Sequence, residues 1–382
     1  MLYLIGFLAA DGGAERFALG LATHLPRDRF EPWFCVPRGA EPAAAAVLRE
    51  AGIPLLDLGR RAKWDVHRLG ALPRLLHNQH FDVLHAHMFG SNLWGTLAGR
   101  ACGVPVRIAH EHTWSYEGDP VRAFLDGRVI GPLASRFIAV SGADAERMVR
   151  IEHVAPDKVT VMPTAYVPRP STGGADLRAE LGLAADTPLY GTAAVMRPQK
   201  ALHVLVEAHA RVVAALPAAR LVIAGDGECR AAVARRIEEL GVGDSVHLLG
   251  RRSDVDAIVA AFDVAAMSSD FEGTPLFALE CLANRTPLVA TAVGGLPDLL
   301  DHGTTGLLVA PRDPVALGEA ILSLLRDPDG RAAMASAAAP RLNDYRIDTI
   351  TGRFADLYEQ LYAEATLAPA PVAAAEGARW AR

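Results

Sequence analysis

The chain has 382 residues and 51% of them are apolar, which is enough for two domains that each have a core. The formal net charge of −6 disfavours a nucleic-acid-binding protein. Four cysteines, Cys35, Cys102, Cys229 and Cys281, lie far apart and show no CxxC or Cys/His spacing. This spacing indicates neither a disulfide framework nor a structural zinc site, so we expect reduced thiols in the cytoplasm.

The N-terminal stretch MLYLIGFLAADGG has no basic lead and only a short apolar run. It therefore predicts a buried strand, not a signal peptide or a membrane-spanning helix. Residues 1–168 hold 18 basic and 17 acidic side chains, and the remainder holds 20 and 27. The nearly neutral first half is compatible with weak peripheral contact with the inner face of a membrane, although no polybasic cluster requires it.

Residues 1–168 alternate apolar runs of strand length with amphipathic stretches of helical length. Continuous apolar runs are typical of strands covered on both faces, so the rhythm predicts an α/β domain with a doubly wound parallel sheet. The predicted strands are Leu2–Leu8, Trp33–Val36, Pro54–Leu58, Val83–His85, Val106–Ala109, Phe137–Val140 and Val159–Met162.

A proline-rich break, VPRPSTGG, separates this domain from a second one with the same rhythm, which we place at 169–345. We expect residues 346–365 to form a helix that packs back toward the N-terminal domain, and residues 366–382, rich in Ala and Pro, to be disordered. The predicted strands of the second domain are Leu189–Val195, Leu221–Ala224, Val246–Leu249, Val264–Met267, Leu288–Thr291 and Gly306–Val309.

The stretch SDFEGTPLFALE contains two carboxylates, Glu272 and Glu280. It predicts a loop after the strand Val264–Met267 and then a helix capped by Thr274 with Pro275 in its first turn. The two carboxylates should stand about 10 Å apart. A retaining hydrolase needs roughly 5–5.5 Å, so this pair is better suited to hold hydroxyls at two ends of an extended ligand such as a sugar nucleotide.

These motifs resemble glycosyltransferase family 4. The resemblance rests on Glu272 and Glu280 with seven residues between them, on PLVATAVGGLPDLL and GTTGLLV, and on DGGAER at 11–16, HEHT at 110–113 and RPQK at 197–200. It implies the GT-B fold, in which two Rossmann-like domains face each other across a cleft. It also implies a retaining transferase that uses a nucleotide-activated sugar and needs no metal.

The resemblance also implies roles for particular residues. Lys200, Arg197 and the backbone of Gly12 and Gly13 would hold the diphosphate, although glycines at a strand-to-helix turn and a surface lysine are equally ordinary features. Glu272 would hold the donor sugar, Glu280 the ribose, and His112 would stabilise positive charge at the anomeric carbon. Arg16 would face the acceptor, and backbone amides of Gly273, Thr274, Pro275 and Leu276 would complete the donor site, except that proline offers none. No motif identifies the sugar, distinguishes UDP from GDP, or names the glycan or lipid-linked acceptor of a cell-surface polysaccharide or glycolipid pathway.

The chain departs from the family in two places. The family usually has an arginine five residues before the lysine and a glycine after it, where this chain has Val195 and Ala201. It also has Thr164-Ala165 in place of Asn-Gly after the last strand of the first domain. A non-catalytic homologue that binds nucleotide sugars is therefore an alternative.

Four histidines offer a rival interpretation. His85, His87, His110 and His112 stand at the ends of two neighbouring predicted strands, where alternate residues share a face, so they could converge on zinc in a metal-dependent hydrolase. No further His or Asp cluster completes a ligand set, and we expect no metal and no other cofactor. The Asp254-Val-Asp256 sequence resembles the DxD motif of metal-dependent transferases, but its position predicts the start of a helix.

Overall fold

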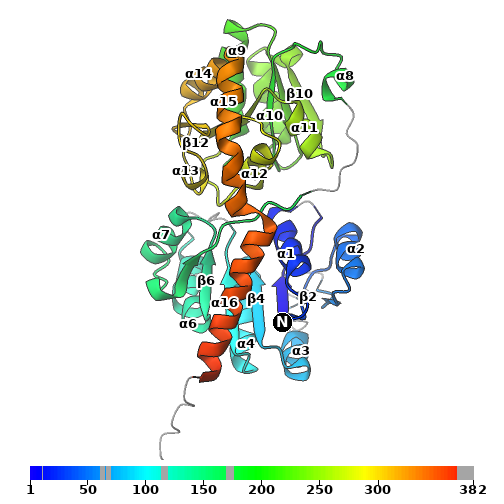
Figure 1. The fold of residues 1–382 in the computed structure, drawn as a ribbon, viewed down its shortest axis with the longest axis vertical. Coiled ribbons are helices and arrows are strands. Elements are labelled where there is room, and N and C mark those ends of the chain that lie inside the picture. The colour runs from blue at the N-terminus through cyan, green and yellow to red at the C-terminus, as the bar shows by residue number, and fades with distance from the viewer. Residues whose placement is uncertain (11, 61–64, 66–69, 113–118, 169–175, 368–382) are drawn as a thin grey trace, which may run out of the picture.

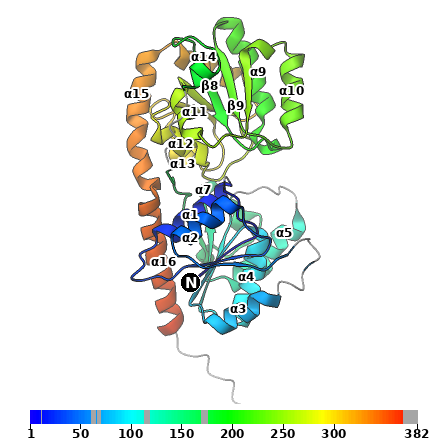
Figure 2. The same ribbon diagram turned by 90° about the vertical axis from the view of Figure 1, so that its right-hand side faces the viewer.

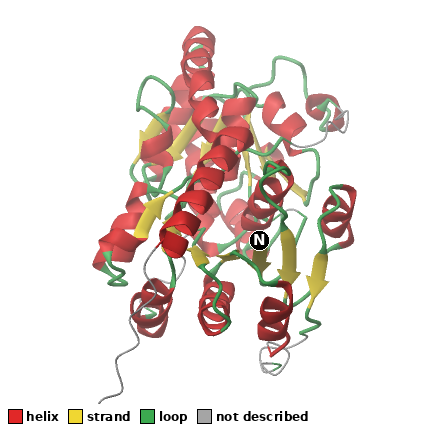
Figure 3. Ribbon diagram, turned by 60° about the horizontal axis from the view of Figure 1, so that its bottom comes forward, coloured by secondary structure: helices red, strands yellow, loops and turns green. Residues whose placement is uncertain are grey.

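The structure, a computed structural model, describes residues 1–10, 12–60, 65, 70–112, 119–168 and 176–367. It contains two α/β domains, each built on one parallel sheet, and they follow each other along the long axis of the molecule (Figure 1). Helices lie on both sides of the strands (Figure 3). This is the doubly wound arrangement that the alternation of apolar and amphipathic segments predicts.

The first sheet has seven strands in the order β3-β2-β1-β4-β5-β6-β7. Every predicted run of this domain overlaps one of them, but β6 begins one residue before its predicted start, at Arg136. The strands β4 and β5 continue past their predicted ends to His87 and His110, whose rings are buried. The strands are β1 (Leu2–Ile5), β2 (Trp33–Val36), β3 (Leu55–Asp57), β4 (Val83–His87), β5 (Val106–His110), β6 (Arg136–Ala139) and β7 (Val159–Val161). The helices between them are α1 (Gly13–His24), α2 (Pro42–Glu50), α3 (Ala71–Gln79), α4 (Phe89–Ala101), α5 (Pro120–Leu125), α6 (Gly131–Leu133) and α7 (Gly142–Arg150), with a π-helical turn at Asp126–Ile130.

The second sheet has six strands in the order β10-β9-β8-β11-β12-β13. The strands are β8 (Leu189–Ala193), β9 (Arg220–Ala224), β10 (Val246–Gly250), β11 (Val264–Met267), β12 (Leu288–Thr291) and β13 (Leu307–Val309). The helices are α8 (Leu177–Glu180), α9 (Leu202–Ala215), α10 (Arg230–Glu239), α11 (Val255–Ala261), α12 (Leu276–Ala283), α13 (Leu296–Leu299), α14 (Pro314–Leu325) and α15 (Pro328–Ala338). Asp254 stands immediately before α11 and forms an ion pair with Arg252, so the DxD sequence begins a helix as its position predicts.

The last helix, α16 (Ile347–Leu367), leaves the second domain and packs against the first (Figure 2). Its apolar face, which includes Phe354 and Tyr358, shares one core cluster with Tyr3 and Phe17 of the first domain. The helix continues two residues beyond the predicted end at 365, and the rest of the predicted tail, 368–382, lies outside the described residues. Among the described helices, none combines the length and apolar character needed to cross a membrane.

Candidate active site

The loop that carries the first carboxylate joins β11 to α12 at the domain interface. The prediction that Thr274 caps α12 is wrong, because its hydroxyl donates to the carbonyl of Val140 in the first domain. Pro275 takes the N-cap position instead, with φ −74° and ψ 126°, and no side chain caps the helix. The sequence missed this because a hydroxyl before proline suits a local cap as well as a contact with another domain.

Glu272 is buried, with 4% of its surface exposed. Its Oε1 accepts hydrogen bonds from Lys200 Nζ and from Ser269 Oγ, both at 2.6 Å. Lys200 ends a 3₁₀ turn, and α9 starts only at Leu202, after Ala201 in a left-handed conformation. The lysine that we assign to a diphosphate therefore stands beside the carboxylate that we assign to the sugar.

Glu280 lies on α12 and is 3% exposed. Its Oε1 accepts a hydrogen bond from Arg16 Nη1 of the first domain at 2.9 Å. Arg16 Nη2 donates to the carbonyl of Val167 at 3.0 Å. Each of the two carboxylates thus has its own cation, and one of these ion pairs joins the two domains.

The start of α1 faces the start of α12. Gly12 is the N-cap of α1 and, being glycine, offers no side chain to cap it, and a β-carbon on the exposed Gly13 would lie 3.6 Å from Leu276 Cδ1. The Glu15 side chain lies back against Gly12, at the predicted diphosphate site, which the sequence analysis did not foresee. Burial raises the pKa of Glu15, and the charge of the exposed Arg197 opposes that rise, so Arg197 acts on the first domain from the second.

Gly273 lies directly against the first domain. A β-carbon at this position would collide with the carbonyl oxygen of His112 and with the side chain of Val140. His112 itself follows β5 and is half-buried. The structure therefore brings Gly273, Glu272 and His112 to one place, and only glycine fits at the contact.

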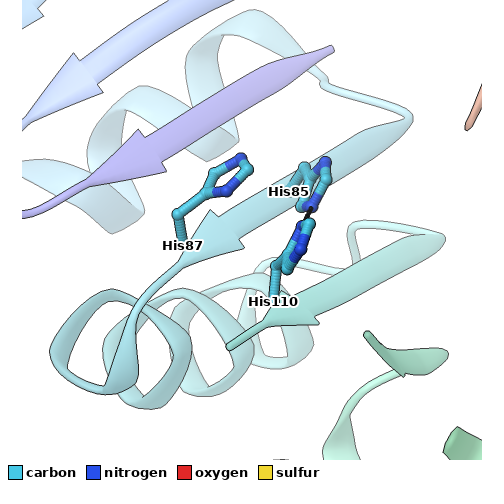
Figure 4. A group of neighbouring side chains, drawn as sticks. All are labelled: His85, His87 and His110. Carbon is cyan, nitrogen blue, oxygen red and sulfur yellow. Dashed lines mark hydrogen bonds between the residues drawn. The ribbon is translucent and has the colours of Figure 1, made fainter. Parts of the chain in front are cut away.

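Four histidine rings stack beside this contact, three of which are drawn in Figure 4. The centroids of His85 and His87 are 4.2 Å apart, as are those of His110 and His112. His85 Nε2 lies 3.1 Å from His110 Nδ1, and His87 Nδ1 lies 2.9 Å from His112 Nε2. Burial lowers the pKa of the first three rings well below the ordinary value and that of His112 to about 3, so all four are neutral at pH 7.

Ring nitrogens of His85, His87 and His110 lie within 4.8 Å of one another, which is the spacing of a potential metal site. Zinc binds histidine at about 2.0–2.1 Å along lone pairs that converge on the ion. The planes of His85 and His110 differ by only 7°, and those of His85 and His87 by 26°. The stacked rings of His85 and His87 keep their lone pairs in separate, nearly parallel planes, and His85 Nε2 already hydrogen-bonds to His110 Nδ1, so metal binding would require these rings to reorient.

Three further polar residues support the site, and the sequence analysis identified none of them. Ser269 holds Glu272, Asn92 on α4 pairs with both backbone groups of His110, and Tyr358 reaches His85. Of these three residues, only Ser269 lies near its partner in the sequence, three positions before Glu272. Of the residues that depart from the family pattern, Thr164 and Ala165 are buried, whereas Val195 is 50% exposed.

The chain matches two protein-family models. The model described as Glycosyltransferase Family 4 covers residues 11–168, and the one described as Glycosyl transferases group 1 covers 175–341. D-inositol 3-phosphate glycosyltransferase from Thermobispora bispora is 30% identical over 73% of this chain and 71% of its own length. The protein of that name from Streptomyces scabiei is 32% identical over 77% and 69%.

Solved structures share the fold. The Anabaena protein HepE, crystallised with UDP-glucose, superposes with a TM-score of 0.81 at 22% identity over 94% of this chain and 99% of its own. Sucrose-phosphate synthase from Thermosynechococcus elongatus gives 0.76 at 20% identity over 95% and 99%. The two-sheet architecture is thus GT-B, and the chain belongs to glycosyltransferase family 4, the enzymes that transfer glycosyl groups.

Proposed function

We propose that the protein is a retaining glycosyltransferase that moves a sugar from a UDP- or GDP-linked donor to a glycan or lipid-linked acceptor, without a metal ion. The observation that carries this proposal is the pair of buried carboxylates at α12, each paired with a separate cation, Lys200 or Arg16. HepE, which has the same fold, was crystallised with UDP and with UDP-glucose, and this supports a nucleotide-sugar donor.

Each carboxylate accepts hydrogen bonds, which suits the hydroxyl pairs at the two ends of a sugar nucleotide. In this proposal Glu272 holds the transferred sugar and Glu280 the ribose. Lys200 then balances the diphosphate charge as the leaving group departs, with Arg197 and the start of α1 near Gly12 adding positive potential. For the diphosphate to enter, the Glu15 side chain has to move away from Gly12.

The proposed reaction needs no base other than the leaving group itself. The bond between the anomeric carbon and the diphosphate breaks, and the acceptor oxygen bonds to that carbon from the same face. The acceptor proton goes to the departing diphosphate. The carbonyl of His112, which lies against Gly273, faces the developing positive charge. Domain contact at Gly273 keeps water away from the donor.

The neutral histidine stack fits a structural role better than the metal site of a hydrolase. The rings of His85 and His110 are nearly parallel, and two of their nitrogens already hydrogen-bond to each other. We place the enzyme in the cytoplasm, with weak contact with the inner face of the membrane through the first domain, and in cell-surface polysaccharide or glycolipid synthesis.

The test is a thermal-shift panel of UDP- and GDP-sugars, because a ligand at about 100 times its Kd adds about 2.7 kcal/mol to stability. The stabilising donor is then incubated with glycan and lipid-linked acceptors, and with D-inositol 3-phosphate, for which the relatives are named. We expect nucleoside diphosphate release that acceptor accelerates, and a product whose anomeric configuration by NMR equals that of the donor. Tight donor binding with no turnover would instead favour the non-catalytic alternative.

A further inference from the structure

One arginine of the first domain contacts both the second domain and a segment that joins the two. Arg16 Nη1 donates to Glu280 Oε1 at 2.9 Å, and Nη2 donates to the carbonyl of Val167 at 3.0 Å. The Arg16 and Glu280 side chains are 10% and 5% exposed. The two arms of one guanidinium therefore hold two separate parts of the chain, which a lysine could not do with the same geometry.

Val167 belongs to the place where the chain crosses between the domains. The segment that leads from the first domain to the second and the segment that leads back lie side by side. The amide of Tyr166 donates to the carbonyl of Tyr345 at 2.7 Å, and Tyr166 forms a parallel bridge with Arg346. Movement of one domain against the other has to be absorbed in these crossing segments. Arg16 thus contacts the hinge with one arm and the second domain with the other.

We propose that Arg16 is a positioning residue that couples closure of the two domains to donor binding through Glu280. The inference rests on the proposed function, in which Glu280 holds the ribose of the donor. It differs from the assignment that the sequence suggests, since Arg16 there faces the acceptor. The contact with Glu280 instead places it on the donor side.

The physical reason is charge balance in the closed state. A buried carboxylate that loses its partner destabilises the structure that buries it. The diphosphate of a donor adds further negative charge nearby. Without Arg16, the closed arrangement carries these charges with less compensation, whereas in an open arrangement water can solvate Glu280. Since the apparent Kd rises as the closed fraction falls, removal of Arg16 should weaken nucleotide binding even if Arg16 never touches the nucleotide.

The experiment compares five full-length variants with the wild type. Arg16→Met removes the guanidinium group. Arg16→Lys keeps the positive charge but replaces the two terminal nitrogens of the guanidinium with one ammonium group. Arg251→Met is a matched control, because Arg251 also pairs across the interface, with Glu41 at 3.9 Å, but its side chain is 66% exposed. Glu280→Gln, alone and combined with Arg16→Met, completes a double-mutant cycle. The measurements are calorimetric titration with UDP and GDP, small-angle X-ray scattering without ligand, and donor kinetics.

We expect Arg16→Met to weaken binding of the nucleotide that the wild type prefers by about 10- to 100-fold. We also expect a larger radius of gyration without ligand, and a higher KM for the donor with a smaller change in kcat. Arg16→Lys should fall between the wild type and Arg16→Met, and Arg251→Met should match the wild type. In the Glu280→Gln background, Arg16→Met should weaken nucleotide binding by less than about threefold, because the charge of Glu280 is already lost.

Wild-type nucleotide affinity or an unchanged radius of gyration in Arg16→Met would overturn the inference. Additive losses in the cycle would also overturn it, since Arg16 would then act on the nucleotide and not through Glu280. A wild type that binds no nucleotide would contradict the proposed function instead. In that case the scattering comparison, which needs no ligand, still decides whether Arg16 holds the domains closed.

Discussion

The hydroxyl of Tyr358 on α16 lies 2.7 Å from Nδ1 of His85 on β4, although 273 residues separate them. The Tyr3 hydroxyl lies 3.4 Å from the same Tyr358 hydroxyl, and both tyrosines are fully buried. A polar chain therefore runs from the return helix, through His85 and His110, to the stack that includes His112.

Tyr358→Phe keeps the ring but leaves His85 Nδ1 without its partner. An unsatisfied buried polar atom costs about 1–3 kcal/mol, and we expect the free energy of unfolding by urea to fall by that amount. Tyr362→Phe, on the same helix but 40% exposed, is the control and should change stability by less than about 0.5 kcal/mol. Equal effects of the two changes would show that the Tyr358 hydroxyl contributes nothing specific.

The two carboxylates should be separable by their ligands. Glu280→Gln loses a charge-assisted acceptor and should weaken both the intact donor and the free nucleoside diphosphate by roughly 1.5–3 kcal/mol. Glu272→Gln should weaken only the intact donor and should lower turnover, because a misplaced anomeric carbon loses alignment with the acceptor. Calorimetry with both ligands checks this, with the exposed Glu319→Gln as control. Equal losses for both ligands in both variants would refute the assignment.

Gly273→Ala should block the domain contact without unfolding either domain. The added β-carbon meets the His112 carbonyl, and the clash is relieved if the domains separate. We expect turnover to fall at least about tenfold while the melting temperature shifts by only a few degrees. Gly352→Ala on α16 is the control, since a β-carbon there meets nothing within 4 Å. Normal turnover in Gly273→Ala would mean that the contact plays no part in the reaction.

Stability should fall as the pH drops below about 6.5. A histidine whose pKa is depressed on folding binds a proton more readily when unfolded, so its contribution is complete above the unfolded pKa of 6.5 and declines by up to about 1.36 kcal/mol per pH unit below it. For His112 the decline continues to about pH 3. Three carboxyls act in the opposite direction, because burial raises the pKa of Glu111 to about 8, that of Asp144 to about 6, and also that of Glu15. Six histidines whose pKa burial lowers outnumber them: His85, His87, His110, His112, His209 and His247.

Urea unfolding at intervals between pH 7 and pH 4.5 measures this slope. His112→Gln should make it shallower, since one depressed group is removed. A free energy of unfolding that stays constant or increases over that range would mean that the rings are not held neutral by the fold.

Activity should survive chelation. Lys200 and the helix starts can balance the diphosphate charge without a divalent ion, so we expect kcat/KM to be unchanged in excess EDTA. Loss of activity that zinc restores would favour the histidine site, with Figure 4 showing the rings that would have to turn. Loss of activity that magnesium restores would instead favour a metal site at Asp254 and Asp256.

The sequence predicted the fold more completely than the site. Buried parallel strands are continuous apolar runs, and β2, β11 and β12 match the predicted strands residue for residue. The bounds of such a strand can be predicted because burial of its own residues makes the run apolar. The pair of carboxylates was equally visible, since Glu272 and Glu280 are only eight positions apart on one loop and helix.

The partner of Glu280 was not visible, because it is set by the packing of one domain on the other. Arg16 is 264 positions from Glu280, and Thr274 is 134 from Val140. Local rules assign a threonine before proline to a helix cap and an arginine in α1 to a free surface. The domain contact overrides both, and no pattern within a single element encodes it.

The adjacent crossings at Tyr166 and Arg346 have a consequence for synthesis on the ribosome. The second domain is inserted into the first, and its core clusters are complete once residues up to 345 have been made. The first domain begins the chain, but its core still lacks Phe354 and Tyr358 at that point. We therefore expect the core of the first domain to be completed only after its last helix has left the exit tunnel, although that domain begins the chain.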